Sequence, residues 1–255
     1  MTSDPRVRTD RDGVVATITI DRPDKLNALD PAMLAALDLT LAEIDRDPAL
    51  RVVVLTGGGE KAFCVGADIG AWSALEPLDM WRSWVREGHR VFDRLAGLRQ
   101  PTIAAINGYC FGGGLELALA CDLRVMATET ALAFPETKIA TLPGWAGTRR
   151  LPELIGPARA KQMVFTGARV DAPTALQWGL ANEILPAADV LARAHSLAQE
   201  ISANAPVALQ LAKAAIDGAP ATLEAIAGAL AASTMDGKEG IAAFREKRPP
   251  TFTGK

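Results

Sequence analysis

The sequence predicts an α/β protein with a helical C-terminal part. Two short runs, RVVVLT at residues 51–56 and TIAAI at residues 102–106, are apolar on both faces, as strands are when helices cover both sides of their sheet. Between such runs, apolar residues recur three and four positions apart, the spacing of a helix that buries one face. After Gly147 the pattern is mostly helical. These observations favour one α/β body followed by packed helices.

The first hundred residues alternate between strand and helix signals. We expect in turn a strand, a helix, a strand, a loop and a long helix, at residues 13–20, 31–47, 51–56, 57–70 and 71–98. The first strand is β-branched, and the first helix has Asp30 as a cap, Pro31 at its first position and Pro48 after its end. Three aromatic residues of the long helix are expected to pack against the core: Trp72, Trp81 and Trp84.

The centre of the chain contains two glycine-rich turns. The strand at 102–106 precedes Gly112–Gly114, and LELALAC then predicts a buried helix. A strand at 122–127 and the bend LPGWAG at 142–147 follow. Glycine allows the backbone to turn sharply and to approach a ligand closely, and the free N–H groups of a helix start favour negative charge. We therefore expect a site that stabilises negative charge here.

The C-terminal part consists of helices without a marked linker. After several short helices, longer alanine-rich ones are expected at residues 188–203, 207–217, 222–235 and 237–247. No Ser/Gly linker, charge block or fixed-period repeat separates them from the body. Closely packing alanine-rich helices suit subunit contacts and core packing equally well.

Composition excludes several classes of function. The 255 residues carry a net charge of −3, which gives no indication of a nucleic-acid surface. No apolar run is long enough to span a bilayer, and the first twelve residues lack the apolar core of a secretory signal. Three cysteines, Cys64, Cys110 and Cys121, have no metal-ligand spacing, as expected for free thiols in a reducing compartment. We expect a cytoplasmic protein without membrane or nucleic-acid partners.

Motifs of other enzyme classes are incomplete. RVVVLTGGGEKA formally matches a dinucleotide fingerprint, but the following AFCVGADIG lacks helical periodicity. No Gly-Lys-Ser/Thr sequence forms a phosphate loop. His89 and His195 are the only histidines, and no Gly-x-Ser-x-Gly turn accompanies them, which argues against a serine triad and a histidine-rich metal site.

Two glutamates beside the glycine-rich turns are the candidate catalytic residues. Glu116 lies in the first turn of the LELALAC helix, among apolar neighbours. A carboxylate there could merely satisfy the helix dipole, but a buried one is rarely retained without a partner or a role. Glu136 follows a proline at a turn, which is ordinary by itself. Together they form a candidate acid/base pair for chemistry on a carbonyl compound.

The sequence resembles the crotonase superfamily, the enoyl-CoA hydratase and isomerase family, over nearly its whole length. The matching segments are DRPDKLNAL, KAFCVGADI, INGYCFGGGLELALACD, FPETKIATLPGWAGTRRL, FTGARV and EGIAAFREKRPPTF. The resemblance implies a spiral of ββα units, here residues 1–195, followed by a helical trimerisation region at 196–255. It also implies a homo-oligomer, a trimer or a dimer of trimers.

The resemblance also implies the site residues. Glu116 and Glu136 match the catalytic glutamates of family hydratases, the N–H groups of Ala67 and Gly113 match the oxyanion hole, and Gly144 matches a glycine that helps to hold the catalytic water. The residues that match positions lining the coenzyme A channel or closing over the nucleotide are Lys25, Leu26, Val65, Asp68, Ile69, Gly70, Phe244 and Lys247. The residues that match the last two often close over the nucleotide, sometimes from an adjacent subunit.

The expected reaction is the addition of water to a trans-2-enoyl-CoA, with no metal and no cofactor other than the coenzyme A of the substrate. Glu116 would take a proton from water and Glu136 would deliver one to C2. The alternatives are an enoyl-CoA isomerase or another crotonase-type acyl-CoA enzyme, and a non-catalytic acyl-CoA-binding oligomer. Trp145 stands where hydratases commonly have a small residue, and Ala146 replaces a common glycine. Trp145 could shape the acyl pocket or form a subunit contact.

Overall fold

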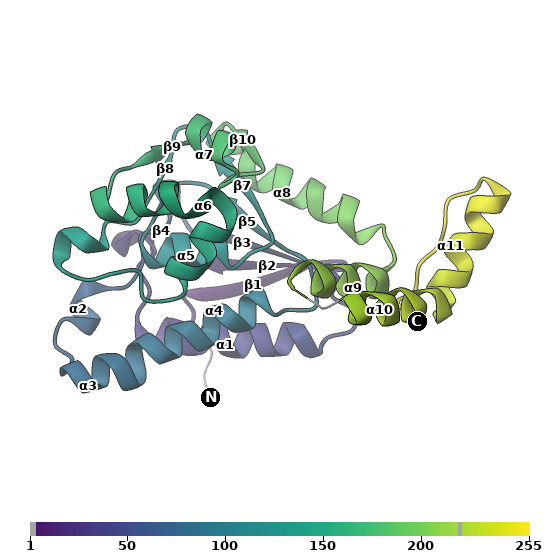
Figure 1. Ribbon diagram of the computed structural model, residues 1–255, viewed down its shortest axis with the longest axis horizontal. Coiled ribbons are helices and arrows are strands. Elements are labelled where there is room, and N and C mark those ends of the chain that lie inside the picture. Colours follow the sequence, from purple (N-terminus) through teal and green to yellow (C-terminus); the bar gives the residue numbers. More distant parts are fainter. Residues whose placement is uncertain (1–3, 219–220) are drawn as a thin grey trace.

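The computed structural model describes residues 4–218 and 221–255, which form two sheets surrounded by helices (Figure 1). The larger sheet has the strand order β1-β2-β3-β5-β7-β10, and all of its pairs except β1–β2 are parallel. Its strands are Val7–Asp12, Val15–Ile20, Val52–Gly57, Thr102–Ile106, Leu123–Ala127 and Glu183–Leu185. The smaller sheet has the order β4-β6-β8-β9, formed by Ala62–Cys64, Tyr109–Phe111, Ala131–Ala133 and Val170–Asp171.

The chain winds through both sheets in repeated turns. Each of β3, β5 and β7 lies in the larger sheet and leads into β4, β6 or β8 of the smaller sheet. A helical segment returns the chain to the larger sheet after β4 and β6, whereas the return after β8 also includes β9 of the smaller sheet. The turn after β2 follows the same path, because Leu29 makes an isolated parallel bridge to Ala67 just beyond β4. The expected spiral of ββα units is therefore confirmed.

Helices cover both sides of the larger sheet, as the apolar strands predict. On one side they pack together with the smaller sheet, and on the other side α8 (Ala187–Ser202) lies across β2, β3, β5 and β7. The other helical segments of the body are η1 Pro23–Lys25, α1 Pro31–Arg46, α2 Ile69–Trp72, α3 Pro77–Asp79, η2 Met80–Val85, α4 Arg86–Ala96, α5 Gly113–Leu119, η3 Glu136–Ile139, α6 Gly147–Thr166 and α7 Ala172–Trp178.

The cap that the sequence predicts for α1 is present. The Asp30 side chain accepts a hydrogen bond from Met33 N at 3.0 Å, and Pro31 occupies the first helical position, where a missing N–H costs nothing. The helix then buries its apolar face against the sheet and α4, and its buried residues include Leu37, Leu41 and Ile44.

Three expectations about the first half of the chain are wrong. Residues 71–98 do not form one helix, because α2 ends at Trp72 and Pro77 begins a new segment that continues through a π-helical stretch into α4. Of its three tryptophans, Trp84 is buried and Trp72 is half-buried, whereas Trp81 is 58% exposed. The expected loop at 57–70 contains β4, whose three residues are too few to show a period. The polar strand β1 was not expected.

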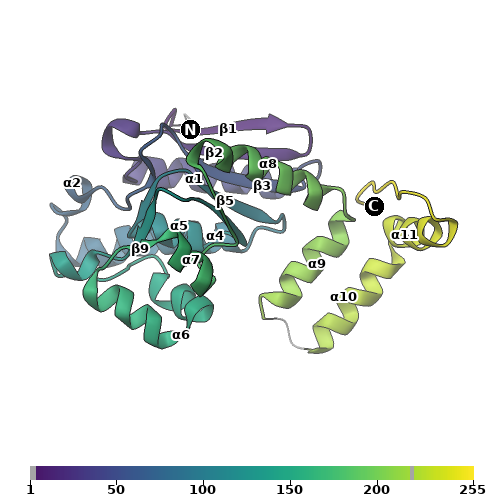
Figure 2. The same ribbon diagram turned by 90° about the horizontal axis from the view of Figure 1, so that it is seen from above.

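Three helices extend from one side of the body (Figure 2): α9 (Pro206–Ile216), α10 (Ala221–Ser233) and α11 (Met235–Glu246). Residue 195, where the expected division falls, lies within α8, which packs on β2, β3, β5 and β7. The chain end returns to the body, where Arg51 donates hydrogen bonds to Ser202 O and Phe252 O.

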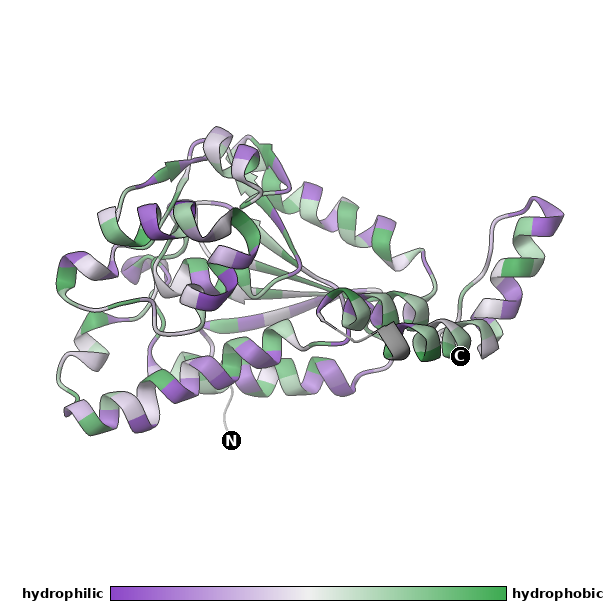
Figure 3. Ribbon diagram, viewed as in Figure 1, coloured by the Kyte–Doolittle hydropathy of each residue, from purple (hydrophilic) through white to green (hydrophobic). Residues whose placement is uncertain are grey.

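The extension exposes many large apolar side chains. Figure 3 shows apolar residues along the central strands and also on these helices. The exposed ones are Ile216, Leu223, Ile226, Leu230, Met235, Ile241 and Phe244. Gathered apolar residues on a surface indicate an interaction site. In the part of the chain that the structure describes, no helix combines the length and the apolar character needed to cross a membrane.

Candidate active site

A largely apolar pocket of about 150 Å³ opens beside the glycine-rich turns. Its walls come from the loop after β4, from α2 and η2, from the start of α5, and from the segment between β8 and α6. Two carboxyl groups, Glu116 and Glu136, are the acidic side chains that line it. A concave apolar site with a few converging polar groups is the usual form of a small-molecule site.

Glu116 is held by backbone donors deep in this pocket. Its side chain is 2% exposed, and its Oε1 accepts hydrogen bonds from Trp145 N and Gly147 N, both at 2.7 Å. Burial raises the pKa of Glu116 to about 7, although the N–H groups of Gly147, Trp145 and Gly144 oppose the rise. The bend at 142–147 therefore fixes the carboxyl group and supports its ionised form.

Glu136 lacks comparable support. Its Oε2 is buried and has no hydrogen-bond partner among the described residues. Burial is the main cause that raises the pKa of Glu136 to about 7, and the negative charge of Glu116 contributes to this rise. Since the two carboxyl groups influence each other, their titration belongs to the pair. The hydrogen bonds at Glu116 favour Glu116 as the ionised member and Glu136 as the protonated one.

Two backbone N–H groups are free to bind an oxygen atom at the pocket. Neither Ala67 N nor Gly113 N donates a hydrogen bond to a protein acceptor within residues 4–218 and 221–255, and both residues line the pocket. A Cβ at Gly66 would lie 2.8 Å from Gly113 N, so the loop carrying Ala67 lies directly against the start of α5. The expected pair of donors is therefore brought to one place.

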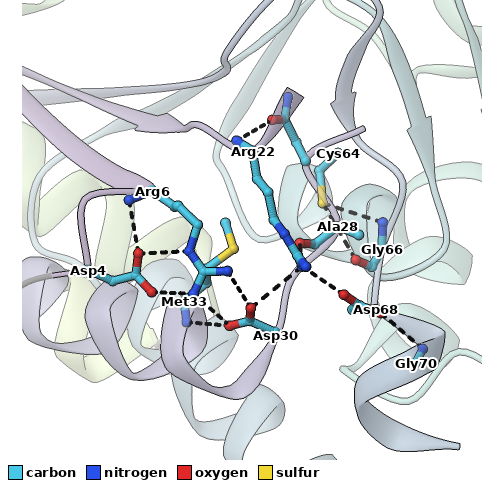
Figure 4. A network of polar contacts seen from close by, with 11 residues as sticks. Asp4, Arg6, Arg22, Ala28, Asp30, Met33, Cys64, Gly66, Asp68 and Gly70 are labelled. Atoms are coloured by element: carbon cyan, nitrogen blue, oxygen red, sulfur yellow. Dashed lines mark hydrogen bonds and ion pairs between the residues drawn. The ribbon is translucent and has the colours of Figure 1, made fainter. Parts of the chain in front are cut away.

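The loop that carries Ala67 is tied to the N-terminal part of the chain. Leu29 N donates to Gly66 O and Asp68 N donates to Leu29 O, both at 2.8 Å, so bonds flank Ala67 on either side. Figure 4 shows a second tie, in which Arg22 contacts the Asp68 carboxylate at 2.8 Å and Asp30 at 3.5 Å. Burial works against ionisation of Asp68, but the hydrogen bond and charge of Arg22 lower its pKa.

Trp145 forms an inner wall of the pocket. Its side chain is 2% exposed, and its ring centroid lies 5.2 Å from those of Trp84 and Phe92. The indole lies between α4 and α5, since a Cβ at Gly88 or at Gly113 would come within 3 Å of it. Of the two roles that the sequence left open, the structure shows the pocket and not a subunit contact.

The structure brings together only part of the expected site. The predicted residues that line the pocket are Val65, Ala67, Ile69, Gly113, Glu116, Glu136 and Gly144. Leu26 lies close by, since its carbonyl accepts from Val65 N at 3.2 Å, and exposed Lys25 precedes it. Asp68, at the start of α2, and Gly70, within α2, lie outside the lining, and the Asp68 carboxylate already contacts Arg22 and Gly70 N.

Phe244 and Lys247 do not line the pocket of their own chain. Both lie at the end of α11, and Phe244 is 87% exposed. Figures 1 and 2 place α11 at the opposite end of the molecule from α2, which borders the pocket. These two residues can contribute to such a site only in another chain.

Sequence reasoning missed much of the apolar lining. The lining residues that the sequence did not indicate are Trp72, Met80, Trp84, Val85, Gly112, Pro135, Ile139, Thr141 and Leu142. Trp72 and Trp84 were expected only as packing residues, because residues 71–98 were interpreted as one helix. Pro77 was the signal that could have separated α2 from η2, since proline is tolerated at a helix start but not inside.

The remaining candidate groups have no visible role at the pocket. Within the described residues, no cluster of His, Cys, Asp or Glu could hold a metal ion. All three cysteines are buried and free. Burial raises the pKa values of Cys64 and Cys121 to about 12, so these thiols stay protonated and unreactive. His195, in α8, lies 3.0 Å from the hydroxyl group of Thr17 in β2, on which α8 packs.

An anchored buried glutamate, a second glutamate and two free backbone donors around an apolar pocket define a site for chemistry at a carbonyl group. The family model described as enoyl-CoA hydratase/isomerase matches residues 10–255. The chain belongs to the enoyl-CoA hydratase/isomerase family.

Known proteins are similar to this chain in sequence and in fold. It is 38% identical to the short-chain-enoyl-CoA hydratase of Clostridium acetobutylicum over 94% of each chain. It is 39% identical to the (E)-benzylidenesuccinyl-CoA hydratase of Thauera aromatica over 94% of this chain and 96% of that one. A crystal structure of enoyl-CoA hydratase from Bacillus anthracis has a TM-score of 0.94 at 38% identity, covering 98% of this chain and all of the other.

Proposed function

We propose that this protein is an enoyl-CoA hydratase, which adds water across the double bond of a trans-2-enoyl-CoA to give a 3-hydroxyacyl-CoA. The main support for the proposal is the set of groups that border one pocket. They are two glutamates in different environments and two free backbone N–H groups. The relatives named as hydratases support the same reaction.

The first role of the site is to stabilise an enolate. The thioester carbonyl accepts hydrogen bonds from Ala67 N and Gly113 N, which have no other acceptor among the described residues. When water adds at C3, negative charge develops on this oxygen atom. Donors already fixed in a pocket of low polarity stabilise that charge without rearranging, and losing one such donor typically costs about 2.7–4 kcal/mol.

The second role is to move two protons. Ionised Glu116 takes a proton from the attacking water while the oxygen atom bonds to C3, and protonated Glu136 gives its proton to C2. After one turnover Glu116 holds a proton and Glu136 does not, so exchange with solvent restores the starting state. The backbone bonds to Glu116 Oε1 and the unpaired Oε2 of Glu136 match this division. Gly144 helps to hold the water, and its position in the pocket lining, in the bend beside Glu116, supports this role.

The coenzyme A part of the substrate lies along Lys25, Leu26 and the loop at 67–70. The chemistry requires no metal and no redox cofactor, because water and the thioester supply all the atoms and electrons. The exposed apolar residues of the extension support a homo-oligomer, either a trimer or a dimer of trimers, in which Phe244 and Lys247 reach the site of a neighbouring chain. We place this reaction in the cytoplasm, and we keep residues 1–195 and 196–255 as core and oligomerisation regions.

The first experiment is hydration of crotonyl-CoA, followed by the loss of enoyl-thioester absorbance. We expect turnover by the parent and a fall of at least a hundredfold in kcat for Glu116→Gln and for Glu136→Gln, since a positioned acid or base contributes about 10²–10⁴. Exposed Glu60 provides a control variant, Glu60→Gln, which should keep the parent rate.

Two other outcomes would replace the proposal. Conversion of a 3-enoyl-CoA to its conjugated isomer without hydration would identify an isomerase. Binding of acyl-CoA that survives both glutamate substitutions, with no turnover by the parent, would identify a binding protein. Light scattering of the purified chain then tests the oligomer, and a monomer at all concentrations would contradict that part.

A further inference from the structure

The relatives named above are hydratases of different acyl-CoA substrates, and the acyl group that this chain accepts depends on the shape of its own pocket. We propose that Trp145, seated against Gly88, closes the inner end of the pocket and restricts the site to short acyl groups of about four to six carbon atoms. This inference rests on the proposed function and names its substrate class.

The position of the indole supports a closed end. Its six-membered ring lies against Gly113, since a Cβ there would be 2.6 Å from Cζ3, and its five-membered ring lies against Gly88, where a Cβ would be 2.0 Å from Nε1. Gly113 N is also a proposed oxyanion donor. The indole therefore fills the space between α4 and α5 immediately beside the reacting carbonyl, where the acyl chain would have to continue inward.

The size of the pocket gives the same limit. An apolar cavity of about 150 Å³ accommodates a benzene molecule, which has six carbon atoms, and this pocket has a volume of about 150 Å³. Trp84, which packs on Trp145, lines the pocket next to it. Ile69, Ile139 and Leu142 line the pocket and are exposed, so they mark its outer end, whereas Trp84 and Trp145 are buried. The free space inside the pocket therefore ends at the two tryptophans.

Gly88 is required for this arrangement. It is a buried residue of α4, and its neighbour is the rigid ring of Trp145 and not a flexible chain end. Alanine at position 88 would therefore push the indole away from α4 and into the pocket. The indole can be changed without loss of the hydrogen bond to Glu116. Trp145 donates that bond through its backbone N–H, which any residue except proline would keep.

The test compares kcat/KM for crotonyl-CoA and trans-2-decenoyl-CoA. We expect the parent to prefer crotonyl-CoA by at least tenfold, and Trp145→Ala to narrow or reverse the preference by improving the longer substrate. Trp145→Leu serves in case the alanine variant folds poorly, because it keeps part of the buried volume. Gly88→Ala should lower kcat/KM for both substrates. Gly97→Ala at the end of the same helix, where a Cβ meets nothing closer than 3.2 Å, should change neither.

Binding of saturated acyl-CoA separates failure of this inference from failure of the proposed function. Butyryl-CoA and decanoyl-CoA have no double bond to hydrate, so calorimetry measures their fit without turnover. Tighter binding of butyryl-CoA by the parent, with a gain for decanoyl-CoA in Trp145→Ala, would support the pocket limit even if no hydration occurs. Equal use or binding of both chain lengths by the parent, or an unchanged ratio in the tryptophan variants, would overturn it.

Discussion

Arg22 and Asp68 join two segments that are 46 residues apart, with Arg22 Nη1 lying 2.8 Å from Asp68 Oδ2. Asp68 directly follows Ala67, whose N–H is one of the two free donors at the pocket. The same Arg22 Nη1 donates to Ala28 O at 3.2 Å, next to Leu29, which bonds the loop on both sides of Ala67. We therefore expect Arg22 to position the proposed oxyanion donor and not to contact the substrate.

Replacing Arg22 should affect the chemical step more than binding. In Arg22→Ala we expect kcat to fall about fivefold with little change in KM, because a partly buried ion pair is worth about 1 kcal/mol. Arg22→Lys should recover part of the rate. The matched control is Arg8→Ala, which removes an exposed ion pair to Asp21 away from the loop. A fall in stability with unchanged kcat would show that Arg22 has only a structural role.

The glutamate pair predicts a bell-shaped dependence of kcat/KM on pH. Hydration needs one ionised and one protonated carboxyl group, and burial raises the pKa values of both Glu116 and Glu136 to about 7. The rate should therefore peak near neutral pH and fall about tenfold per unit on each side. Crotonyl-CoA hydration measured from pH 4.5 to 9.5 tests this. A rate that stays flat from pH 5 to 9 would contradict the shared titration.

The same burial predicts a pH-dependent gain in stability for Glu136→Gln. The pKa of Glu136 rises from its usual 4.5 to about 7 in the folded chain, so its carboxyl group favours folding fully below pH 4.5, and this contribution is lost as the pH rises through 7. Glutamine carries no charge and avoids that loss. We expect the variant to be more stable than the parent by about 1–2 kcal/mol at pH 8.5 and equally stable at pH 4.5.

Denaturant unfolding of both proteins at one fixed concentration would measure this difference, since oligomer assembly also affects stability. Glu60→Gln, at an exposed position, should show no difference at either pH. A gain of equal size at pH 4.5 and pH 8.5 would mean that a better fit of the amide, and not the loss of a buried charge, stabilises the variant.

The sequence predicted the parts of the site that belong to continuous motifs. Glu116 follows a glycine turn in an apolar helix, so its burial could be expected from its neighbours. The strands β3 and β5 are apolar on both faces, which places them in a covered sheet. Ala67 and Gly113 came from resemblance, because backbone donors leave no side-chain signal of their own.

The sequence could not predict contacts between distant segments. The tie between Arg22 and Asp68 and the packing of Trp145 on Gly88 each join residues more than forty positions apart. No local period records such a pair. Short strands such as β4, β6 and β8 were missed for a related reason, since three residues form a strand here only because a neighbouring strand supplies the hydrogen bonds.

Ala146 adopts a backbone conformation that glycine reaches more easily than alanine does. It has φ 78°, in the left-handed region, and it precedes the first residue of α6. A Cβ in this region costs roughly 1–2 kcal/mol, whereas glycine adds an entropic cost of roughly 0.5–1 kcal/mol. Ala146→Gly should therefore stabilise the fold by up to about 1 kcal/mol, which raises the melting temperature by about 2–4 °C for a chain of this size.

Thermal unfolding measures the melting temperature of Ala146→Gly beside that of a control variant, Ala35→Gly. Ala35 lies at an exposed site within α1, where the same change should lower stability by about 0.5–1 kcal/mol. If both variants lose stability equally, the surrounding bend relieves the strain at Ala146, and glycine has no advantage there.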